Sequence, residues 1–221
     1  LIHAHDHIAF GSLNYMLAEE FYGASLLLLY KGINSPYTSI LKNLLLPAYA
    51  YEFPNIEMIA LRFTRAVYED SIDINELDPY LMMLDKVESF LVNQGEQERL
   101  ELVRRSFYFK VGIALSDESK GSARKDWRLE VLINKVKQWS WPSGKLISLD
   151  SRNEWNVNHV IEERAILIDE FTRSYQFLSD FAREESLDNN LIKQTDVNVL
   201  GRKLYAAFER KAGKIDIIHQ G

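Results

Sequence analysis

The sequence predicts an all-α protein built as a single domain of about eight helices. Apolar residues recur three and four positions apart along nearly the whole chain, and the strict alternation that is typical of strands is rare. Residue types that start and end helices lie at the boundaries of these periodic segments. The chain has 221 residues, 47% of them hydrophobic, and is therefore long enough to bury a sizeable core.

The apolar spacing predicts helices over residues 13–31, 36–52, 55–69, 79–93, 96–116, 125–140, 155–185 and 196–210. Two starts share one device, a capping side chain followed by proline at the first helical position: Ser35-Pro36 and Asp78-Pro79. Asn55 is predicted to cap the third helix and Asp196 the last.

Glycine and proline mark the predicted ends of helices. Gly32 and Gly213 suit a left-handed residue after the first and last helices, and residues 141–144 (WPSG) predict a turn. The β-branched pattern of residues 214–219 indicates a possible C-terminal strand with partners outside this chain. We treat residues 1–221 as one domain, with a possible subdivision near residue 121.

Composition limits the classes of function. A net charge of −6 and a pI near 5.5 argue against a nucleic-acid-binding protein but leave room for an ATP site formed by a few local cations. The absence of cysteine excludes disulfides and thiolate chemistry. The longest apolar run, residues 24–30, is shorter than the ~20 residues of a membrane span, so we expect no membrane span and a cytoplasmic location. The chain begins at Leu1 and not at Met, which suggests a fragment of a longer polypeptide, or a disordered or processed start.

Several segments carry a resemblance to a known family. Residues 20–31 read EFYGASLLLLYK and are followed by SPY at 35–37, LKNLLL at 41–46, LDPYLMML at 77–84, RLELVRRSFYFKV at 99–111 and RKLYAAFE at 202–209. Together they resemble the class I adenylate cyclases, the cyclic-AMP-forming enzymes of enterobacteria and their relatives. That family usually carries Tyr-Phe where this chain has Phe21-Tyr22, and Trp where it has Leu27.

The resemblance implies a role for this chain within a larger enzyme. In that family a nucleotidyltransferase-like half precedes this region and carries a Gly-Ser pair and an Asp-x-Asp pair that holds Mg. Neither Gly11-Ser12 nor Gly121-Ser122 is followed by such a pair, so we expect no catalytic residue and no metal ligand here, and no activity of this chain alone. The implied partners are ATP, the missing half of the same polypeptide and a possible regulatory protein.

A candidate ATP-contacting set surrounds residues 30–42. Lys31 and Lys42 offer cations to a triphosphate, and the helix start at Ser35 offers free N–H groups and the positive end of a helix dipole. Tyr30 and Tyr37 offer flat faces to an adenine. The alternative is that Ser35 only caps its helix and that both lysines are solvated.

Other clusters are better explained by structure than by chemistry. Arg104 and Arg105 are predicted to pair with Glu98 or Glu101 on a buried helix. Arg202-Lys203 forms a second basic cluster near Tyr205, explained by dipole complementation. We predict that the four tryptophans pack in the core: Trp127, Trp139, Trp141 and Trp155. Glu19-Glu20 are predicted to lie on an exposed helix face. The histidines His3, His5 and His7 are predicted to lie in a solvated terminus instead of a metallohydrolase site.

Two functional hypotheses remain from the sequence. The first is a helical part of an adenylate cyclase that orients ATP and braces the catalytic half. The second is a non-catalytic all-α regulatory or protein-docking module. A basic concave surface at Lys31, Ser35 and Lys42 would favour the first, and an exposed apolar patch would favour the second.

Overall fold

The computed structural model describes residues 24–52, 55–116, 126–188 and 194–208. Within these ranges every regular element is helical and no strand occurs, which confirms the all-α prediction. The predictions for the histidine-rich start, Glu19-Glu20, Gly213, the C-terminal strand and the subdivision near residue 121 lie outside the described residues.

A helix over residues 24–32 comes first in the described chain. The elements that follow are α2 (Pro36–Asn43), α3 (Leu45–Glu52), α4 (Ile59–Tyr68), α5 (Ile74–Leu77), α6 (Pro79–Gln94), α7 (Gln97–Val111), α8 (Trp127–Gln138), α9 (Ser143–Asp150), a 3₁₀ turn (Arg152–Glu154), α10 (Val157–Asp188) and α11 (Gln194–Phe208).

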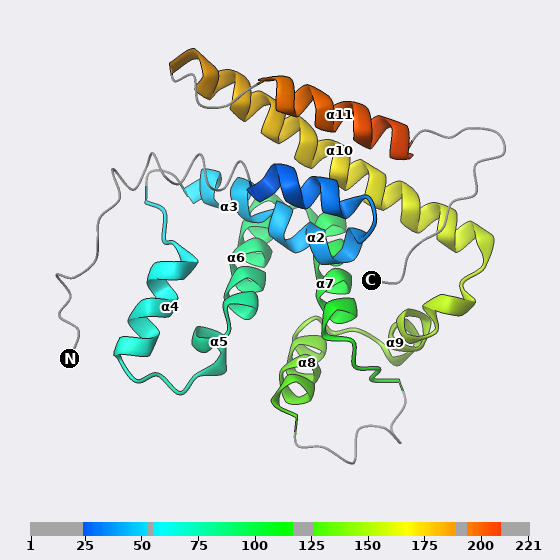
Figure 1. The fold of residues 1–221 in the computed structure, drawn as a ribbon. Coiled ribbons are helices and arrows are strands. Elements are labelled where there is room, and N and C mark those ends of the chain that lie inside the picture. The colour runs from blue at the N-terminus through cyan, green and yellow to red at the C-terminus, as the bar shows by residue number, and fades with distance from the viewer. Residues whose placement is uncertain (1–23, 53–54, 117–125, 189–193, 209–221) are drawn as a thin grey trace.

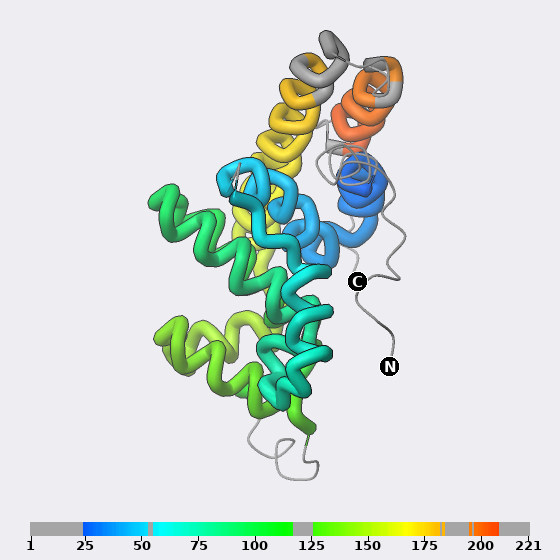
Figure 2. Tube along the Cα trace, turned by 90° about the vertical axis from the view of Figure 1, so that its left-hand side faces the viewer, coloured from blue at the N-terminus to red at the C-terminus, as the bar shows by residue number. Residues whose placement is uncertain are grey.

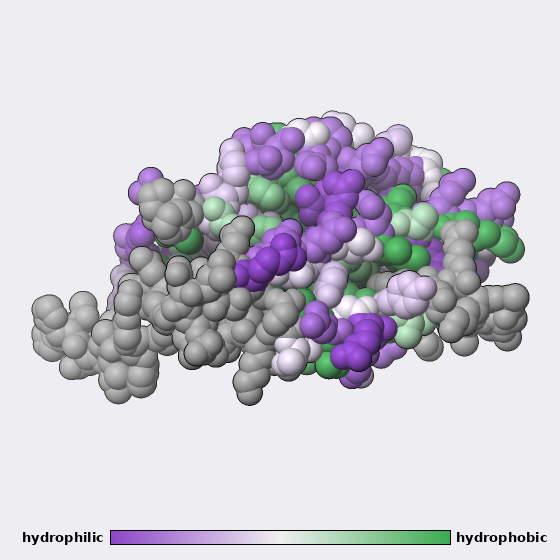
Figure 3. Space-filling model, turned by 90° about the horizontal axis from the view of Figure 1, so that it is seen from above, coloured by the Kyte–Doolittle hydropathy of each residue, from purple (hydrophilic) through white to green (hydrophobic). Residues whose placement is uncertain are grey.

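The helices are stacked in layers. The long α10 and α11 run side by side along one edge, and the 24–32 helix and α2 lie directly beneath them (Figure 1). Next come α6 and α7, with α8 and α9 at the far end, and Figure 2 shows the same order from the side. The core lies where α2, α6, α7 and α10 meet, and its fully buried side chains include Leu41, Leu84, Val103 and Phe171. The face seen in Figure 3 is largely hydrophilic, with smaller hydrophobic areas between.

The prediction of one helix over residues 36–52 is wrong at its centre. The structure has two helices, α2 and α3, separated at Leu44. Pro47 explains the break, because it has no N–H to donate to the carbonyl of Asn43 and its ring would collide with that carbonyl. In α3, Pro47 falls in the first turn, where the missing N–H has no cost.

The predicted helix starts are partly confirmed. Asp78 caps α6, and its carboxylate accepts hydrogen bonds from the N–H groups of Tyr80 and Leu81 at 2.8 and 2.9 Å. Asn55 does not cap the third helix: α4 begins four residues later, and its Ile59 N–H donates to the Tyr49 hydroxyl at 3.0 Å. Asp196 is also not a cap, because it lies inside α11.

Two short helices, α5 and α9, were not predicted from the sequence. The WPSG segment was predicted as a turn, but Pro142 directly precedes α9, which continues to Asp150. Asp73 caps the one-turn helix α5 by accepting from the Asn75 N–H at 2.9 Å. Both lie in stretches too short for a clear apolar period, so the signal from hydrophobic spacing was weak.

Gly32 ends its helix for a different reason from the one predicted. Its φ is not positive, whereas Gly95 and Gly112, after α6 and α7, do adopt the left-handed conformation. A Cβ on Gly32 would lie 2.4 and 2.6 Å from two ring carbons of Phe171 on α10. Glycine is therefore required here by the close approach of two helices.

The hydroxyl of Tyr80 on α6 is buried and has no hydrogen-bond partner among the described residues. Burial raises the pKa of Tyr80 to about 12. Because the pKa in the unfolded chain is about 10, the folded state favours the neutral phenol. This contribution to stability is complete below pH 10 and is lost as the pH rises towards 12.

We therefore expect Tyr80→Phe to be neutral or slightly stabilising at pH 7, because it removes an unpaired buried hydroxyl. Between pH 10 and pH 12 the variant should lose less stability than the original chain, by about 1.4 kcal/mol for each pH unit. Urea unfolding at pH 7, 10 and 11 measures both effects. A variant that is destabilised at pH 7 and has the same alkaline slope would contradict this account.

Candidate functional site

Three of the five predicted ATP-contacting residues lie together at one corner of the fold. Tyr30 and Lys31 occupy the last turns of the 24–32 helix, and a tight turn leads from there into α2. In that turn the N–H of Ser35 donates to the Lys31 carbonyl at 3.0 Å. Lys31 is exposed and forms no ion pair with any described residue. This corner therefore presents one cation beside the start of α2.

Lys203 from α11 also reaches this corner. Its ammonium nitrogen lies over the Tyr30 ring, 4.5 Å from the ring centroid, and Tyr30 is 45% exposed. The attraction of a cation to the negative face of an aromatic ring holds such a pair together. The sequence placed Lys203 in a separate basic cluster, and nothing in the local pattern shows that it meets a residue 173 positions earlier. The packing of α11 over the 24–32 helix makes this contact.

The start of α2 has neither a capping side chain nor an acidic residue. Ser35 is at the N-cap, as predicted, but its hydroxyl makes no capping hydrogen bond, and the first turn holds no acidic residue. The Ser35 carbonyl instead accepts from the hydroxyls of Thr38 and Ser39 at 2.9 and 3.3 Å. The N–H groups at the start of α2 thus have no side-chain cap, which leaves the positive end of the helix dipole uncompensated.

Lys42 and Tyr37 are not part of this corner. Lys42 is exposed in the last turn of α2, roughly 10 Å along the axis from Ser35 at a rise of ~1.5 Å per residue. Tyr37 points into the core, where it is 5% exposed and its ring meets Phe109 edge-on with centroids 4.7 Å apart. Its ring faces therefore pack against protein in this structure.

A buried polar network fixes α2 against α7 and α10. The Tyr37 hydroxyl donates to Glu163 Oε1 at 3.0 Å, and Arg105 Nη1 lies 3.1 Å from Glu163 Oε2. Glu163 is 1% exposed. Burial, followed by the charge of Glu163 and the hydrogen bond to it, raises the pKa of Tyr37 above its ordinary value. A carboxylate at this depth is tolerated because a cation and a hydroxyl satisfy it.

A second buried carboxylate joins α10 to α7 at another point. Arg99 forms a two-pronged pair with Glu170, with N···O distances of 2.7 and 3.0 Å. The Ser174 hydroxyl donates to the same carboxylate at 3.2 Å. Planar pairing of this kind constrains orientation as well as distance. The two networks together set the position of α10, and with it the helices that form the corner.

The predicted partners of the arginine pair on α7 are wrong. Arg104 pairs with Glu88 of α6 at 2.7 Å, and Arg105 pairs with Glu163 of α10, instead of with Glu98 or Glu101 on their own helix. Glu101 is used elsewhere, where it accepts from Trp141 Nε1 at 2.9 Å. Helical spacing identifies only those ion-pair partners that lie on the same helix. In the structure the aromatic residues of α7 are buried, and both arginines pair with glutamates of neighbouring helices.

Packing explains most of the tryptophans, as predicted. Trp139 and Trp141 lie with centroids 4.8 Å apart, and Trp155 stacks on His159 at 4.1 Å. Trp127 differs from the prediction, because it lies at the start of α8 and is almost half exposed.

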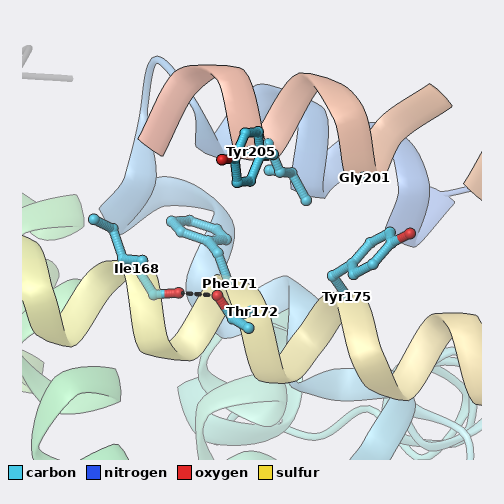
Figure 4. Close-up of a pocket in the computed structure, with 7 residues that line it drawn as sticks. Ile168, Phe171, Thr172, Tyr175, Gly201 and Tyr205 are labelled. Atoms are coloured by element: carbon cyan, nitrogen blue, oxygen red, sulfur yellow. Dashed lines mark hydrogen bonds between the residues drawn. The ribbon is translucent and has the colours of Figure 1, made fainter. Parts of the chain in front are cut away.

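An apolar cavity of about 350 Å³ lies between α10 and α11 (Figure 4). The figure shows Phe171 and Tyr175 rising from α10 towards Gly201 and Tyr205 of α11. A Cβ on Gly201 would lie 2.3 Å from the Tyr175 hydroxyl, so the glycine makes room for this ring. The cavity has no charged lining residue and therefore does not suit a triphosphate. The sequence pattern did not reveal it.

The described part of the chain contains no group of three or more His, Asp or Glu side chains that could hold a metal ion. None of the helices in the described ranges is both long enough and apolar enough to cross a membrane.

Comparison with known proteins identifies the family. A family model described as "Adenylate cyclase, class-I, second domain" matches residues 16–219. The chain belongs to the class I adenylate cyclases. The family resemblance predicted from the signature segments is thus confirmed. No solved structure shows significant similarity to this class I domain.

Relatives of this adenylate cyclase domain come from enterobacteria. The chain is 43% identical over 209 residues to the adenylate cyclase of Escherichia coli O6:H1 (strain CFT073) and equally to that of Salmonella typhimurium (strain LT2). It is 40% identical to the adenylate cyclase of Proteus mirabilis. Each alignment covers 95% of this chain but only 24% of the relative, so the class I domain described here spans about a quarter of the length of those proteins.

Proposed function

We propose that this domain is part of an adenylate cyclase that converts ATP to cyclic AMP and pyrophosphate. In that reaction the ribose 3′-hydroxyl attacks the α-phosphorus, and pyrophosphate leaves with the electrons of the broken P–O bond. Membership of the class I family carries the proposal. We place the catalytic groups and Mg on the remainder of the polypeptide, so that this domain alone makes no cyclic AMP. A cytoplasmic location fits the use of ATP.

Within this proposal the corner formed by Tyr30, Lys31 and Ser35 receives the nucleotide. Its support is an exposed cation, an uncapped helix start and a half-exposed aromatic ring in one place. The triphosphate would meet Lys31 and the N–H groups of α2, as anions commonly do at helix starts. Tyr30 would stack on the adenine with the ring face that Lys203 does not cover.

The other two candidates receive different roles. Lys42, at the far end of α2, would meet a phosphate only if the nucleotide extends along the helix. Tyr37 acts as a positioning residue, because its hydroxyl holds α2 on Glu163 and its ring is buried. The orientation of the helix start towards ATP then depends on the Tyr37–Glu163–Arg105 network.

Lys31→Ala in the full-length enzyme is expected to lower kcat/KM for ATP roughly tenfold, which corresponds to about 1.4 kcal/mol of lost phosphate binding. A cyclase assay over a range of Mg-ATP concentrations measures this change. Lys137→Ala on α8 is the matched control, because Lys137 is also an exposed lysine but lies in another layer of the fold. Equal kinetics for Lys31→Ala and the original enzyme would remove Lys31 from the proposal.

A non-catalytic docking role is the second candidate function, and one observation favours it. Helix α4 and the connector after it expose the apolar residues Leu61, Tyr68 and Ile72, each by more than half. The partner in that case would be a regulatory protein or another part of the same enzyme.

A further inference from the structure

Helix α4 is apolar in sequence but is hardly buried in this domain. Its sequence is IALRFTRAVY, and Ala66 is its only fully buried residue. The helices α6 and α7, in contrast, each bury at least five side chains. In the described chain α4 packs mainly against α5 and α6 and lies on one flank of the fold (Figure 1). Much of the apolar surface of α4 therefore remains in contact with water.

The open side of α4 has a defined set of residues. Leu61 and Tyr68 are seven positions apart, so they share one face of the helix, and they are 52% and 60% exposed. Ile72, in the connector after the helix, is 98% exposed. We call these three residues the α4 face. Charged groups lie beside it, including the exposed Arg65–Glu57 pair with an N···O distance of 3.2 Å. Apolar anchors with a charged rim are typical of interfaces.

The end of α4 is rigidly built. Asp70 adopts a left-handed conformation with φ of 51°, the Asp70 N–H donates to the Val67 carbonyl at 3.3 Å, and the Ser71 N–H donates to the Ala66 carbonyl at 2.9 Å. These two hydrogen bonds form a Schellman motif, which fixes the chain direction after the helix. Ile72 is thus held outward by a defined turn.

Two observations indicate what covers this face. The matching family model is a second domain, and the chain spans only 24% of the length of its relatives, so most of such a polypeptide lies outside the region described here. Domains of one chain commonly meet through surfaces that combine apolar and polar residues. In Figure 1 helix α4 also lies well apart from the turn between the 24–32 helix and α2. A contact at α4 would leave the nucleotide corner open.

We infer that the α4 face docks onto the remainder of the same cyclase polypeptide. This inference rests on the proposed function, because it takes this domain to be part of a longer cyclase. Burial of Leu61, Tyr68 and Ile72 in that contact would supply the apolar packing that α4 lacks within this domain. Docking would anchor the domain at one flank and leave its opposite side for ATP.

Thiol accessibility in the full-length protein tests this inference, since the described domain has no cysteine of its own. Tyr68→Cys and Ile72→Cys are the test variants. Val157→Cys, at the start of α10, is the matched control because Val157 is 73% exposed and lies in a different layer. The rate of modification by a small maleimide is followed at the labelled peptide by mass spectrometry, first in native protein and then in urea, where all sites should react equally.

We expect both α4 thiols to react at least tenfold more slowly than the control in native, monomeric protein. Equal rates would overturn the inference. Protection that appears only as protein concentration rises would also overturn it, because a second copy would then cover the face. The assay needs neither ATP nor activity. Protected thiols in a protein that makes no cyclic AMP would support docking and contradict the proposed function. Fully reactive thiols in an active enzyme would support the proposed function and contradict docking.

Discussion

Glu163→Ala is expected to lower the free energy of unfolding by about 3–5 kcal/mol, the usual cost of removing one partner from a buried ion pair. Glu163 is 1% exposed and serves both Tyr37 and Arg105. Without the carboxylate, a guanidinium and a hydroxyl remain in the core with no acceptor. The Nε of Arg105 already lacks a hydrogen-bond partner among the described residues. Urea unfolding at pH 7 measures the loss.

Three further variants show whether the charge or the packing is responsible. Glu162→Ala is the matched control, because Glu162 is the exposed neighbour on the same helix and should change stability by less than about 0.5 kcal/mol. Glu163→Gln keeps an acceptor for Tyr37 but loses the charge, so its cost should fall between the two.

The triple variant Tyr37→Phe/Arg105→Met/Glu163→Leu replaces the whole network with apolar groups and should cost less than Glu163→Ala alone. A loss below about 1 kcal/mol for Glu163→Ala would contradict the role given to the network.

Gly32→Ala is expected to destabilise the domain by about 2–3 kcal/mol, at the upper end of the usual cost of overpacking. The new methyl group would lie 2.4 Å from a Phe171 ring carbon, far inside contact distance. Phe171 is 1% exposed and cannot move outward without opening the contact between α10 and the 24–32 helix. Because that helix carries Tyr30 and Lys31, the same variant should also weaken ATP use in the full-length enzyme.

The explanation for Gly32 is specific enough to test with a second substitution. Phe171→Leu removes ring atoms at the point of contact, so Gly32→Ala/Phe171→Leu should be more stable than the sum of the two single effects predicts. Gly144→Ala in α9 is the control, because no atom lies within 4 Å of its Cβ position and its φ is not positive. It should be neutral or stabilising by about 0.5–1 kcal/mol. A strictly additive double variant would show that steric overlap is not the cause.

The candidate site shows how far sequence reasoning extended. Tyr30, Lys31 and Ser35 were predicted as a group, and they do lie together, because they are close in sequence and one turn joins them. Tyr37 was placed in the same group, but its side chain, at the second position of α2, is buried in the core. Lys203, Glu163 and Glu170 could not be connected with this region, because their contacts join helices more than 70 residues apart.

The sequence by itself determined the all-α class, the family and the start of α6, because apolar spacing, signature segments and Asp78-Pro79 are local features. It also showed the two lysines of residues 31–42 and predicted a helix over residues 55–69, where α4 lies. Only the tertiary structure decided that Gly32 allows the close contact of its helix with Phe171 of α10. It also decided which glutamates form ion pairs with the arginines of α7, and that most of α4 is exposed to water. The physical reason is that burial and partner choice depend on how helices distant in sequence pack together, which local periodicity does not encode.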